Sequence, residues 1–291
     1  MFGGGAITGS ERIIDTSFGD TWTWDGKTWT LRPTTPHPSA RYQPAMASFG
    51  RTAVLFGGEP RPGQPPLGDT WVWDGARWDE RHPAHIPPAR ASQAMATANG
   101  RLVLHGGFDL RFSPMADTWL WDGTDWTPVT TSGSPAVAGF CMAGSAEQIL
   151  AAGGVGFTRG ETWLYEGKWS SVSLDVLPQR SGCAMTALGN RRFLLFGGSG
   201  KDFHFLNDTW VYDADPKTWS QISASGPPAR NQPAMVTFQD RVVLFGGEAA
   251  TDGPSVALHD TWAFDGTAWT QVPPSLDDPP GRFGHAMAVI P

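Results

Sequence analysis

The stretch Arg41–Trp78 decides the fold, because its parts recur along the whole chain. It reads as Arg41-Tyr42-Gln43-Pro44-Ala45-Met46, then Ala53-Val54-Leu55-Phe56-Gly57-Gly58, then Asp69-Thr70-Trp71-Val72-Trp73-Asp74-Gly75, and then Trp78. The double glycine returns at Gly3-Gly4, Gly57-Gly58, Gly106-Gly107, Gly153-Gly154, Gly197-Gly198 and Gly246-Gly247, in steps of 54, 49, 47, 44 and 49 residues. A repeat of this length with several short strands is typical of a propeller blade.

The chemistry of the repeat favours strands. Ala53–Phe56 is a continuous apolar run, as in a strand buried on both faces. Trp71 and Trp73 are two residues apart and share one face of the next strand, and Asp74-Gly75 predicts a hairpin. Of 15 tryptophans, twelve stand in repeated positions, so we expect them to fill the space between blades rather than to stack on sugars.

These residues resemble the kelch repeat, through the double glycine after an apolar run, the downstream aromatic pair and the closing tryptophan. The resemblance covers nearly the whole chain and implies a β-propeller of four-stranded antiparallel blades around a central channel. We therefore expect one all-β domain, a six-bladed β-propeller.

The first double glycine has no alanine/methionine strand before it, and the last such strand, in Arg282–Ile290, has no double glycine after it. The C-terminal strand should thus close the ring by joining the N-terminal blade. The expected blades are residues 282–291 with 1–36, then 37–84, 85–132, 133–176, 177–225 and 226–281.

Composition narrows the classes of function. The net charge is −7, without a cluster of Lys or Arg, which argues against a nucleic-acid surface. No stretch approaches 18 consecutive apolar residues, so no membrane span is expected. No signal peptide is visible, which predicts a cytoplasmic protein, with secretion after removal of a leader as the alternative. We also expect a monomer. Cys141 and Cys183 stand at different offsets in neighbouring inner strands, which predicts two free thiols.

The loops between the second and third strands of each blade are unequal. They span residues 5–19, 59–68, 108–116, 155–160, 199–207 and 248–259, and so predict a pocket on this face, with a high wall over the sixth, first and second blades.

Kelch relatives imply three layers of channel-lining residues: Tyr42, Ala91, Ala138, Ser181, Asn231 and Phe283; Pro44, Gln93, Phe140, Cys183, Pro233 and His285; and six methionines, Met46, Met95, Met142, Met185, Met235 and Met287. We expect the methionine layer to plug the channel; the alternative is that its thioether groups bind copper(I). If the phase is wrong by one residue, the methionines pack between blades instead.

An arginine opens five of the six inner strands, and the exception, Val137, occurs in the one blade with Glu161 in place of the repeated Asp. This coincidence indicates that Arg and Asp pair within the other blades. An anion-binding ring of arginines is the alternative.

The candidate site residues lie around the expected pocket. Rim acids and a channel histidine could serve as acid and base: Glu59, Glu248 and His285. The ligand-binding candidates are Glu11, Arg12, Tyr42, Asp109, Asn231 and Phe283. The sixth loop resembles the Glu-x-x-x-Asp-x-x-x-His iron motif of plant specifier proteins, although its histidine comes three residues late. It suggests a divalent metal at Glu248, Asp252 and His259. No other cofactor is predicted.

Two functions remain open. The first is recognition of a small molecule or a short peptide at the pocket face. The alternative is a stand-alone enzyme, an isomerase, lyase or cyclase acting on a small metabolite with the rim carboxylates and the channel histidine. Galactose oxidase and bacterial sialic acid mutarotases are related kelch proteins, but no residue motif here carries their activities across.

Overall fold

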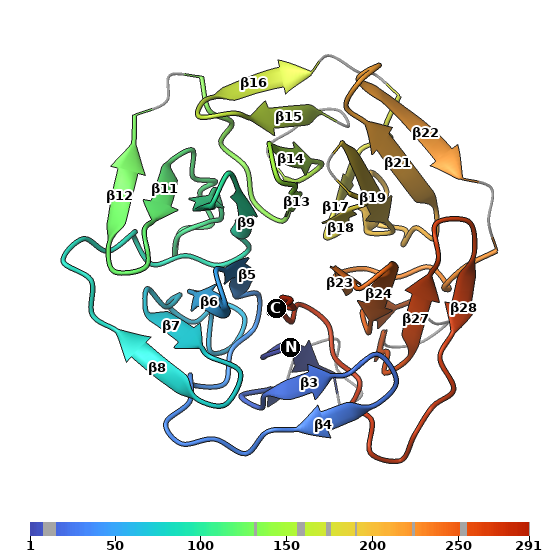
Figure 1. The fold of residues 1–291 in the computed structure, drawn as a ribbon, viewed down its shortest axis with the longest axis horizontal. Helices are drawn as coiled ribbons and strands as arrows, with labels where there is room; N and C mark the ends of the chain where they lie inside the picture. The colour runs from blue at the N-terminus through green and yellow to red at the C-terminus, as the bar shows by residue number, and fades with distance from the viewer. Residues whose placement is uncertain are drawn as a thin grey trace.

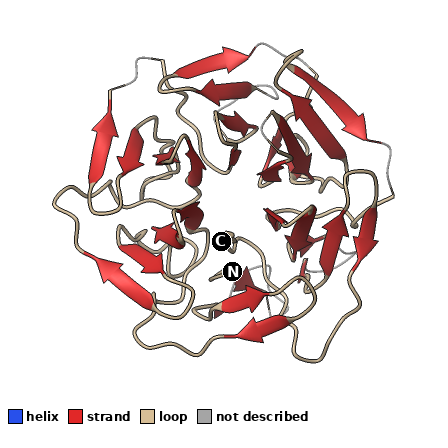
Figure 2. Ribbon diagram, in the orientation of Figure 1, coloured by secondary structure: helices blue, strands red, loops and turns tan. Residues whose placement is uncertain are grey.

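The chain folds into a ring of radial β-sheets around a central channel (Figures 1 and 2). The computed structural model describes residues 1–7, 16–130, 133–155, 161–172, 176–189, 191–222, 225–250 and 255–290. Within these ranges the regular structure is β-strand throughout. The prediction of an all-β propeller is therefore confirmed.

Five repeats form four-stranded antiparallel sheets, whose strands follow one another from the channel outward in chain order. Their bounds are β5 (Ala45–Phe49), β6 (Thr52–Phe56), β7 (Thr70–Trp73) and β8 (Trp78–Arg81); β9 (Ala94–Ala98), β10 (Arg101–His105), β11 (Thr118–Trp121) and β12 (Trp126–Val129); β13 (Cys141–Gly144), β14 (Ile149–Ala152), β15 (Thr162–Tyr165) and β16 (Trp169–Val172); β18 (Ala184–Ala187), β19 (Arg192–Phe196), β21 (Thr209–Asp213) and β22 (Thr218–Ile222); and β23 (Ala234–Phe238), β24 (Arg241–Phe245), β27 (Thr261–Phe264) and β28 (Trp269–Gln271).

The repeat built from the two chain ends is different, and here the prediction of six four-stranded blades is wrong. Its sheet has two strands, β3 (Trp22–Trp24) and β4 (Trp29–Leu31). On its channel side Phe2 forms single-residue bridges to Thr21 and to Ala286. The structure thus has five four-stranded blades. The physical reason is that the inner segments of this repeat come from opposite ends of the chain, so no hairpin between them fixes a longer register.

Loop segments on one side of the ring form three short two-stranded sheets. They are β1 (Gly5–Ala6) with β2 (Thr16–Ser17), β17 (Arg180–Ser181) with β20 (Ser199–Gly200), and β25 (Glu248–Ala249) with β26 (Val256–Ala257). β17 and β20 join the start of an inner strand to the loop after a double glycine, and β1 and β25 do so through the single bridges Gly5–Phe283 and Asn231–Glu248.

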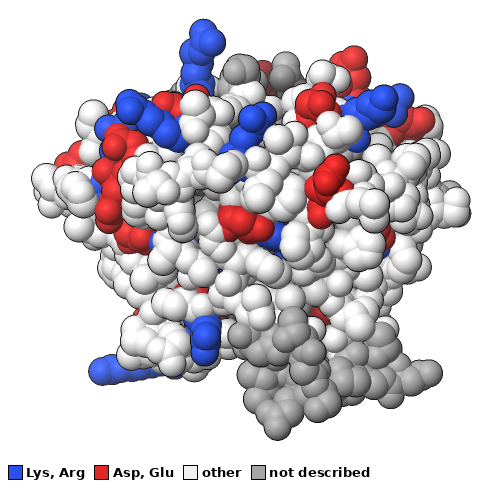
Figure 3. All heavy atoms as spheres, turned by 90° about the horizontal axis from the view of Figure 1, so that it is seen from below, with Lys and Arg blue, Asp and Glu red and all other residues white. Residues whose placement is uncertain are grey.

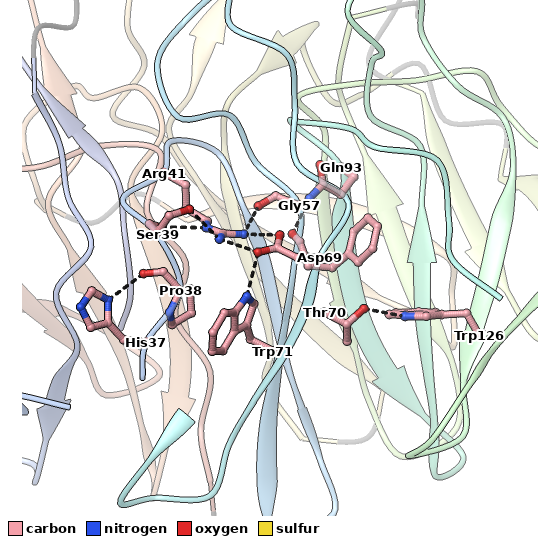
Figure 4. A network of polar contacts seen from close by, with 11 residues as sticks. His37, Pro38, Ser39, Arg41, Gly57, Asp69, Thr70, Trp71, Gln93 and Trp126 are labelled. Carbon is pink, nitrogen blue, oxygen red and sulfur yellow. Dashed lines mark hydrogen bonds and ion pairs between the residues drawn. The ribbon is translucent and has the colours of Figure 1, made fainter. Parts of the chain in front are cut away.

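The hydrophobic core lies between neighbouring sheets. In one cluster Val54 and Phe56 of one sheet contact Met95, Leu104 and Trp126 of the next. Every repeat-closing tryptophan also donates its indole N–H to a threonine of the preceding repeat, as Trp126 does to Thr70 (Figure 4) and Trp29 does to Thr261 across the chain ends.

The methionines belong to these clusters, and all six also line a channel cavity of about 320 Å³, so they line the channel but do not plug it. Met95, Met142, Met185 and Met235 are buried between sheets, and Met46 and Met287 pack against clusters there. The reason is geometric: the sheets are radial, so both faces of an inner strand point toward the adjacent sheets and only its edge faces the axis.

The repeated arginines pair with the repeated aspartates, as the sequence indicated. Arg41 is fully buried, and its guanidinium donates to both carboxylate oxygens of Asp69 at 2.6 and 2.8 Å and to the carbonyl of Gly57 at 3.0 Å (Figure 4). The same bidentate pairs are Arg90–Asp117, Arg180–Asp208, Arg230–Asp260 and Arg282–Asp20. Each pair joins the start of an inner strand to the start of the third strand of the same repeat.

The prediction of two free thiols is wrong, because Cys141 and Cys183 form a disulfide, with Cα atoms 5.6 Å apart. The prediction assumed that opposite faces of neighbouring inner strands point away from each other. In a ring of radial sheets these faces meet between adjacent repeats: Cys183 shares its face with Met185 and meets Cys141 there, whereas Ala184 packs toward the following repeat.

Candidate functional site

One mouth of the channel is framed by six residues in the left-handed region, two positions after each repeated Arg or Val137. They are Gln43, Ser92, Gly139, Gly182, Gln232 and Gly284, with φ between 52° and 63°. The backbone N–H of each donates to the carbonyl of the preceding one, from Ser92 to Gln43 onward, and Gln43 donates to Gly284 to close the circle. We call this closed circle the channel ring. It links the five inner strands and the inner segment near the C-terminus through backbone hydrogen bonds alone.

A cavity of about 410 Å³ lies at the channel ring. All six channel-ring residues line it, together with the six residues that follow them: Pro44, Gln93, Phe140, Cys183, Pro233 and His285. Loop residues Phe108, Phe112, Pro114 and Val155 and the strand-start residues Ala138, Ser181 and Asn231 complete the lining. No Lys, Arg, Asp or Glu is among the lining residues, so within the described part of the chain the cavity is uncharged.

The cavity wall has a polar part and an apolar part. In the polar part Ser92 donates to the amide oxygen of Gln43, whose amide nitrogen donates to the Tyr42 hydroxyl at 3.2 Å, and Tyr42 donates to the amide oxygen of Gln232. Burial raises the pKa of Tyr42, so the hydroxyl keeps its proton for Gln232. With its oxygen taken, Gln232 has its amide N–H groups left to offer a ligand.

The part of the wall next to Ser92, where Phe108 pairs with Ala91, is apolar and partly open. Phe108 and Phe112 stack with ring centroids 5.3 Å apart, and Phe112 and Val155 are exposed although they line the cavity. Large exposed apolar side chains at a cavity are typical of a binding surface. The cavity therefore combines amides and hydroxyls with an aromatic wall.

Three residues of the cavity wall carry buried polar atoms that lack a hydrogen-bond partner among the described residues. They are both ring nitrogens of His285, the amide oxygen of Gln93 and that of Asn231. Burial, with the nearby Arg282 and chain-end amine, lowers the pKa of His285 well below 6.5, so its ring is neutral. An unpaired buried polar atom costs about 1–3 kcal/mol, so three such residues in the wall of one cavity are unusual.

The predicted site residues separate into two groups. Asn231 and His285 line the cavity. Tyr42 and Phe283 are buried beside it, with ring centroids 5.7 Å apart in an edge-to-face contact. Glu59 is buried and accepts the Gly63 N–H at 3.1 Å, and burial raises its pKa.

The other candidates lie farther from the lining. Glu248 is half-buried and its carboxylate accepts the Asn231 amide at 3.5 Å. Asp109 caps its own loop by accepting the N–H groups of Arg111 and Ser113. Glu11, Arg12 and Asp252 lie outside the described residues. Gln43, Ser92 and Gln232 were not predicted; glycines at three equivalent positions were the signal for the left-handed conformation that brings them to the cavity.

The metal site at Glu248, Asp252 and His259 remains a prediction. In the described part of the chain no three His, Cys, Asp or Glu side chains are grouped as a metal site. Of the proposed ligands Glu248 is half-buried and His259 is exposed, while Asp252 is not described.

The outer surface is mixed in charge. Figure 3 shows acidic and basic side chains intermingled on the face in view, rather than gathered by sign. Among the described residues no helix is long and apolar enough to cross a membrane.

Comparison with known proteins agrees with this architecture. Residues 163–291 match the family model described as the KLHDC2/KLHL20/DRC7 Kelch-repeats domain. The chain is 32% identical over 131 residues to Adagio-like protein 3 of Oryza sativa subsp. japonica, which is 42% of this chain and 20% of that protein. It is 30% identical over 135 residues to the dynein alpha chain of the flagellar outer arm of Chlamydomonas reinhardtii, 43% of this chain and 3% of that one. An F-box/kelch-repeat protein of Arabidopsis thaliana is 27% identical over 141 residues, 41% of this chain and 29% of that protein. The matches thus span less than a third of each relative. They confirm the kelch-repeat resemblance.

Proposed function

We propose that this kelch-repeat β-propeller is a recognition module whose channel-mouth cavity binds an uncharged small molecule or short peptide segment. The observation that carries the proposal is the lining: an uncharged cavity of about 410 Å³ with both amide groups and phenylalanine side chains in its wall. Pockets with apolar walls and a few placed polar groups are typical of ligand sites.

The absence of charge in the lining selects against ions. A charged ligand would lose its hydration on entry and meet no opposite charge, which costs several kcal/mol. A neutral amide-bearing ligand can instead exchange hydrogen bonds with Gln232 and Gln43 while its apolar part covers Phe112. The enzyme alternative has less support, because of Glu59, Glu248 and His285 only His285 lines the cavity.

A matched pair of probes tests the proposal. N-acetyl-phenylalanine amide and N-acetyl-phenylalanine differ in that the second carries a carboxylate, and binding is measured by chemical-shift perturbation or thermal shift. We expect the amide to bind at least tenfold more tightly. Equal or tighter binding of the acid would contradict the uncharged-ligand proposal.

The chain offers a matched pair of variants for locating the site. Phe112 and Phe203 are both exposed loop phenylalanines with φ of 57° and 58°, but only Phe112 lines the cavity. Phe112→Ala should weaken binding of the amide about fivefold or more, and Phe203→Ala should leave it unchanged. Loss of binding in Phe203→Ala alone would place the site elsewhere.

A further inference from the structure

The repeat of β13–β16 does not contain the arginine–aspartate pair that the other five repeats share. Val137 stands in the position of the repeated arginine and is fully buried, and Glu161 stands in the position of the aspartate. In the other repeats the arginine also donates to the carbonyl of the first glycine of the double glycine, as Arg41 does to Gly57. A valine side chain has no donor, so neither bond can form at the start of this inner strand.

The same repeat carries the disulfide. Cys141, the first residue of β13, is bonded to Cys183, which directly precedes β18 of the next repeat (Figure 1). The equivalent positions at the other five junctions between repeats hold an alanine and a residue other than cysteine: Ala45 and Gln93, Ala94 and Phe140, Ala184 and Pro233, Ala234 and His285, and Ala286 and Pro44. A missing ion pair and an added covalent bond therefore coincide in one repeat.

The disulfide lies in the wall of the channel-mouth cavity. Cys183 is itself a lining residue, and the repeat of β13–β16 supplies four more, Ala138, Gly139, Phe140 and Val155. Ala138 and Val155 exchange backbone hydrogen bonds, which tie the loop after the double glycine to the inner segment. Whatever fixes the inner segment of this repeat therefore also fixes its part of the cavity wall.

We propose that the Cys141–Cys183 disulfide is a redox switch that controls ligand binding in the channel-mouth cavity. This inference rests on the proposed function. In the oxidised chain the covalent bond takes the place of the missing ion pair and holds the inner segment of the repeat in its binding position. Reduction leaves the repeat with neither restraint, so this part of the wall moves more freely and the ligand binds more weakly.

The reductant is a dithiol, and the exchange proceeds in two steps. One thiolate of the dithiol attacks the sulfur of Cys183, and the Cys141 sulfur leaves as a thiolate that takes up a proton. The second thiolate then attacks the dithiol sulfur of this mixed disulfide, and the Cys183 sulfur leaves and takes up a proton. The protein gains two electrons and two protons, and the dithiol departs as its own disulfide. A ligand in the cavity covers Cys183 and should slow the first step.

Dithiothreitol tests the switch on the full chain, with NMR binding of N-acetyl-phenylalanine amide as the readout. We expect reduction to lower Tm by about 5 °C or more and to weaken amide binding about fivefold or more. Saturating amide should slow the appearance of free thiols. The variant Cys141→Ala with Cys183→Ser should bind the amide as weakly as the reduced chain and should not respond to dithiothreitol.

A matched control moves the disulfide to a junction between two repeats that keep their ion pairs. In the variant without the native cysteines, Ala184→Cys with Pro233→Cys places a disulfide at the equivalent positions, between the repeats of Arg180–Asp208 and Arg230–Asp260. Its amide binding is compared between its own oxidised and reduced forms and should not differ. Conversely, Val137→Arg with Glu161→Asp supplies the missing pair and should reduce the effect of dithiothreitol on the chain with native cysteines.

The outcomes separate the switch from the proposed function. If the amide binds the oxidised and reduced chains equally, the disulfide is a structural bond only and the switch is overturned, whereas the recognition function stands. If the moved disulfide affects binding as strongly as the native one, the missing ion pair is not the cause and the proposal is overturned. If the amide binds neither form, the proposed function fails and the switch fails with it.

Discussion

At the scale of single residues, the buried arginines are the most consequential feature of the repeat. Each arginine is fully buried or nearly so. Its two terminal guanidinium nitrogens donate to an aspartate, and the guanidinium also donates to two backbone carbonyls, as in Arg230. Burial alone would raise the pKa of Asp260, but the hydrogen bonds and charge of Arg230 outweigh it and lower that pKa below 3.8. The arginine and aspartate are thus mutually dependent.

Removing one partner should be costly. We expect Arg230→Ala to lower the free energy of unfolding by about 3 kcal/mol, because Asp260 and the carbonyl of Gly246 lose their donor. Denaturant titration at pH 7 measures the effect. The double variant Arg230→Ala with Asp260→Ala should lose less than the sum of the two single changes. Unchanged stability together with lost ligand binding would favour the anion-binding alternative.

The same pair predicts a pH dependence. Because the pKa of Asp260 is lower in the folded state, its stabilising contribution is complete above 3.8 and is lost as pH falls through the folded value. The stability difference between the native chain and Arg230→Ala should therefore be largest near pH 5–7 and shrink below pH 3.8. A constant difference across this range would show that the ion pair is not its source.

At the scale of elements, the left-handed residue before each inner strand sets where the strand points. Gly284 and Gly139 have nearly the same φ, 61° and 62°, but different surroundings. A Cβ on Gly284 would lie 2.2 Å from the Tyr42 ring, whereas the nearest atom to a Cβ on Gly139 is 4.0 Å away on Ser181. The two glycines therefore separate backbone strain from steric contact.

Alanine substitution at these two positions tests this separation. Gly139→Ala should cost about 1–2 kcal/mol from the left-handed conformation alone. Gly284→Ala should cost about 2–5 kcal/mol, because Tyr42 must also move and release Gln232. Thermal denaturation ranks the two variants. An equal loss of stability in the two variants would mean that Tyr42 moves aside without an energetic cost.

At the scale of the whole molecule, the ring is held closed by contacts between chain ends. Arg282 binds Asp20, Ala286 pairs with Phe2, and Gly284 completes the channel ring with Gln43. Closure removes exposed sheet edges that would otherwise pair with other chains.

Deleting residues 282–291 should abolish these contacts together. We expect the truncated protein to aggregate or to unfold at a much lower temperature, as measured by size-exclusion chromatography and thermal melting. Leu276→Ala, at a fully exposed position in the same region, is the control and should behave like the native chain. A truncated protein that stays monodisperse with unchanged Tm would contradict closure by the chain ends.

The sequence by itself determined the repeated architecture, because the repeat is local. Double glycines, aromatic pairs and hairpin signals act within a few residues of one another, and one exception, Val137 with Glu161, was enough to infer the Arg–Asp pairs. The candidate site was only partly predictable: His285 and Asn231 line the cavity, whereas Gln43, Ser92 and Gln232 were missed.

Only the tertiary structure decided the features that depend on contacts between repeats. The channel ring, the Cys141–Cys183 disulfide and the packing of methionines between sheets follow from how radial sheets meet at the axis. The two-stranded chain-end repeat follows from joining segments from opposite ends of the chain, as Phe2 and Ala286, 284 residues apart, show. Residue alternation along one strand cannot predict these features, because it does not show which face of that strand meets which face of the neighbouring repeat.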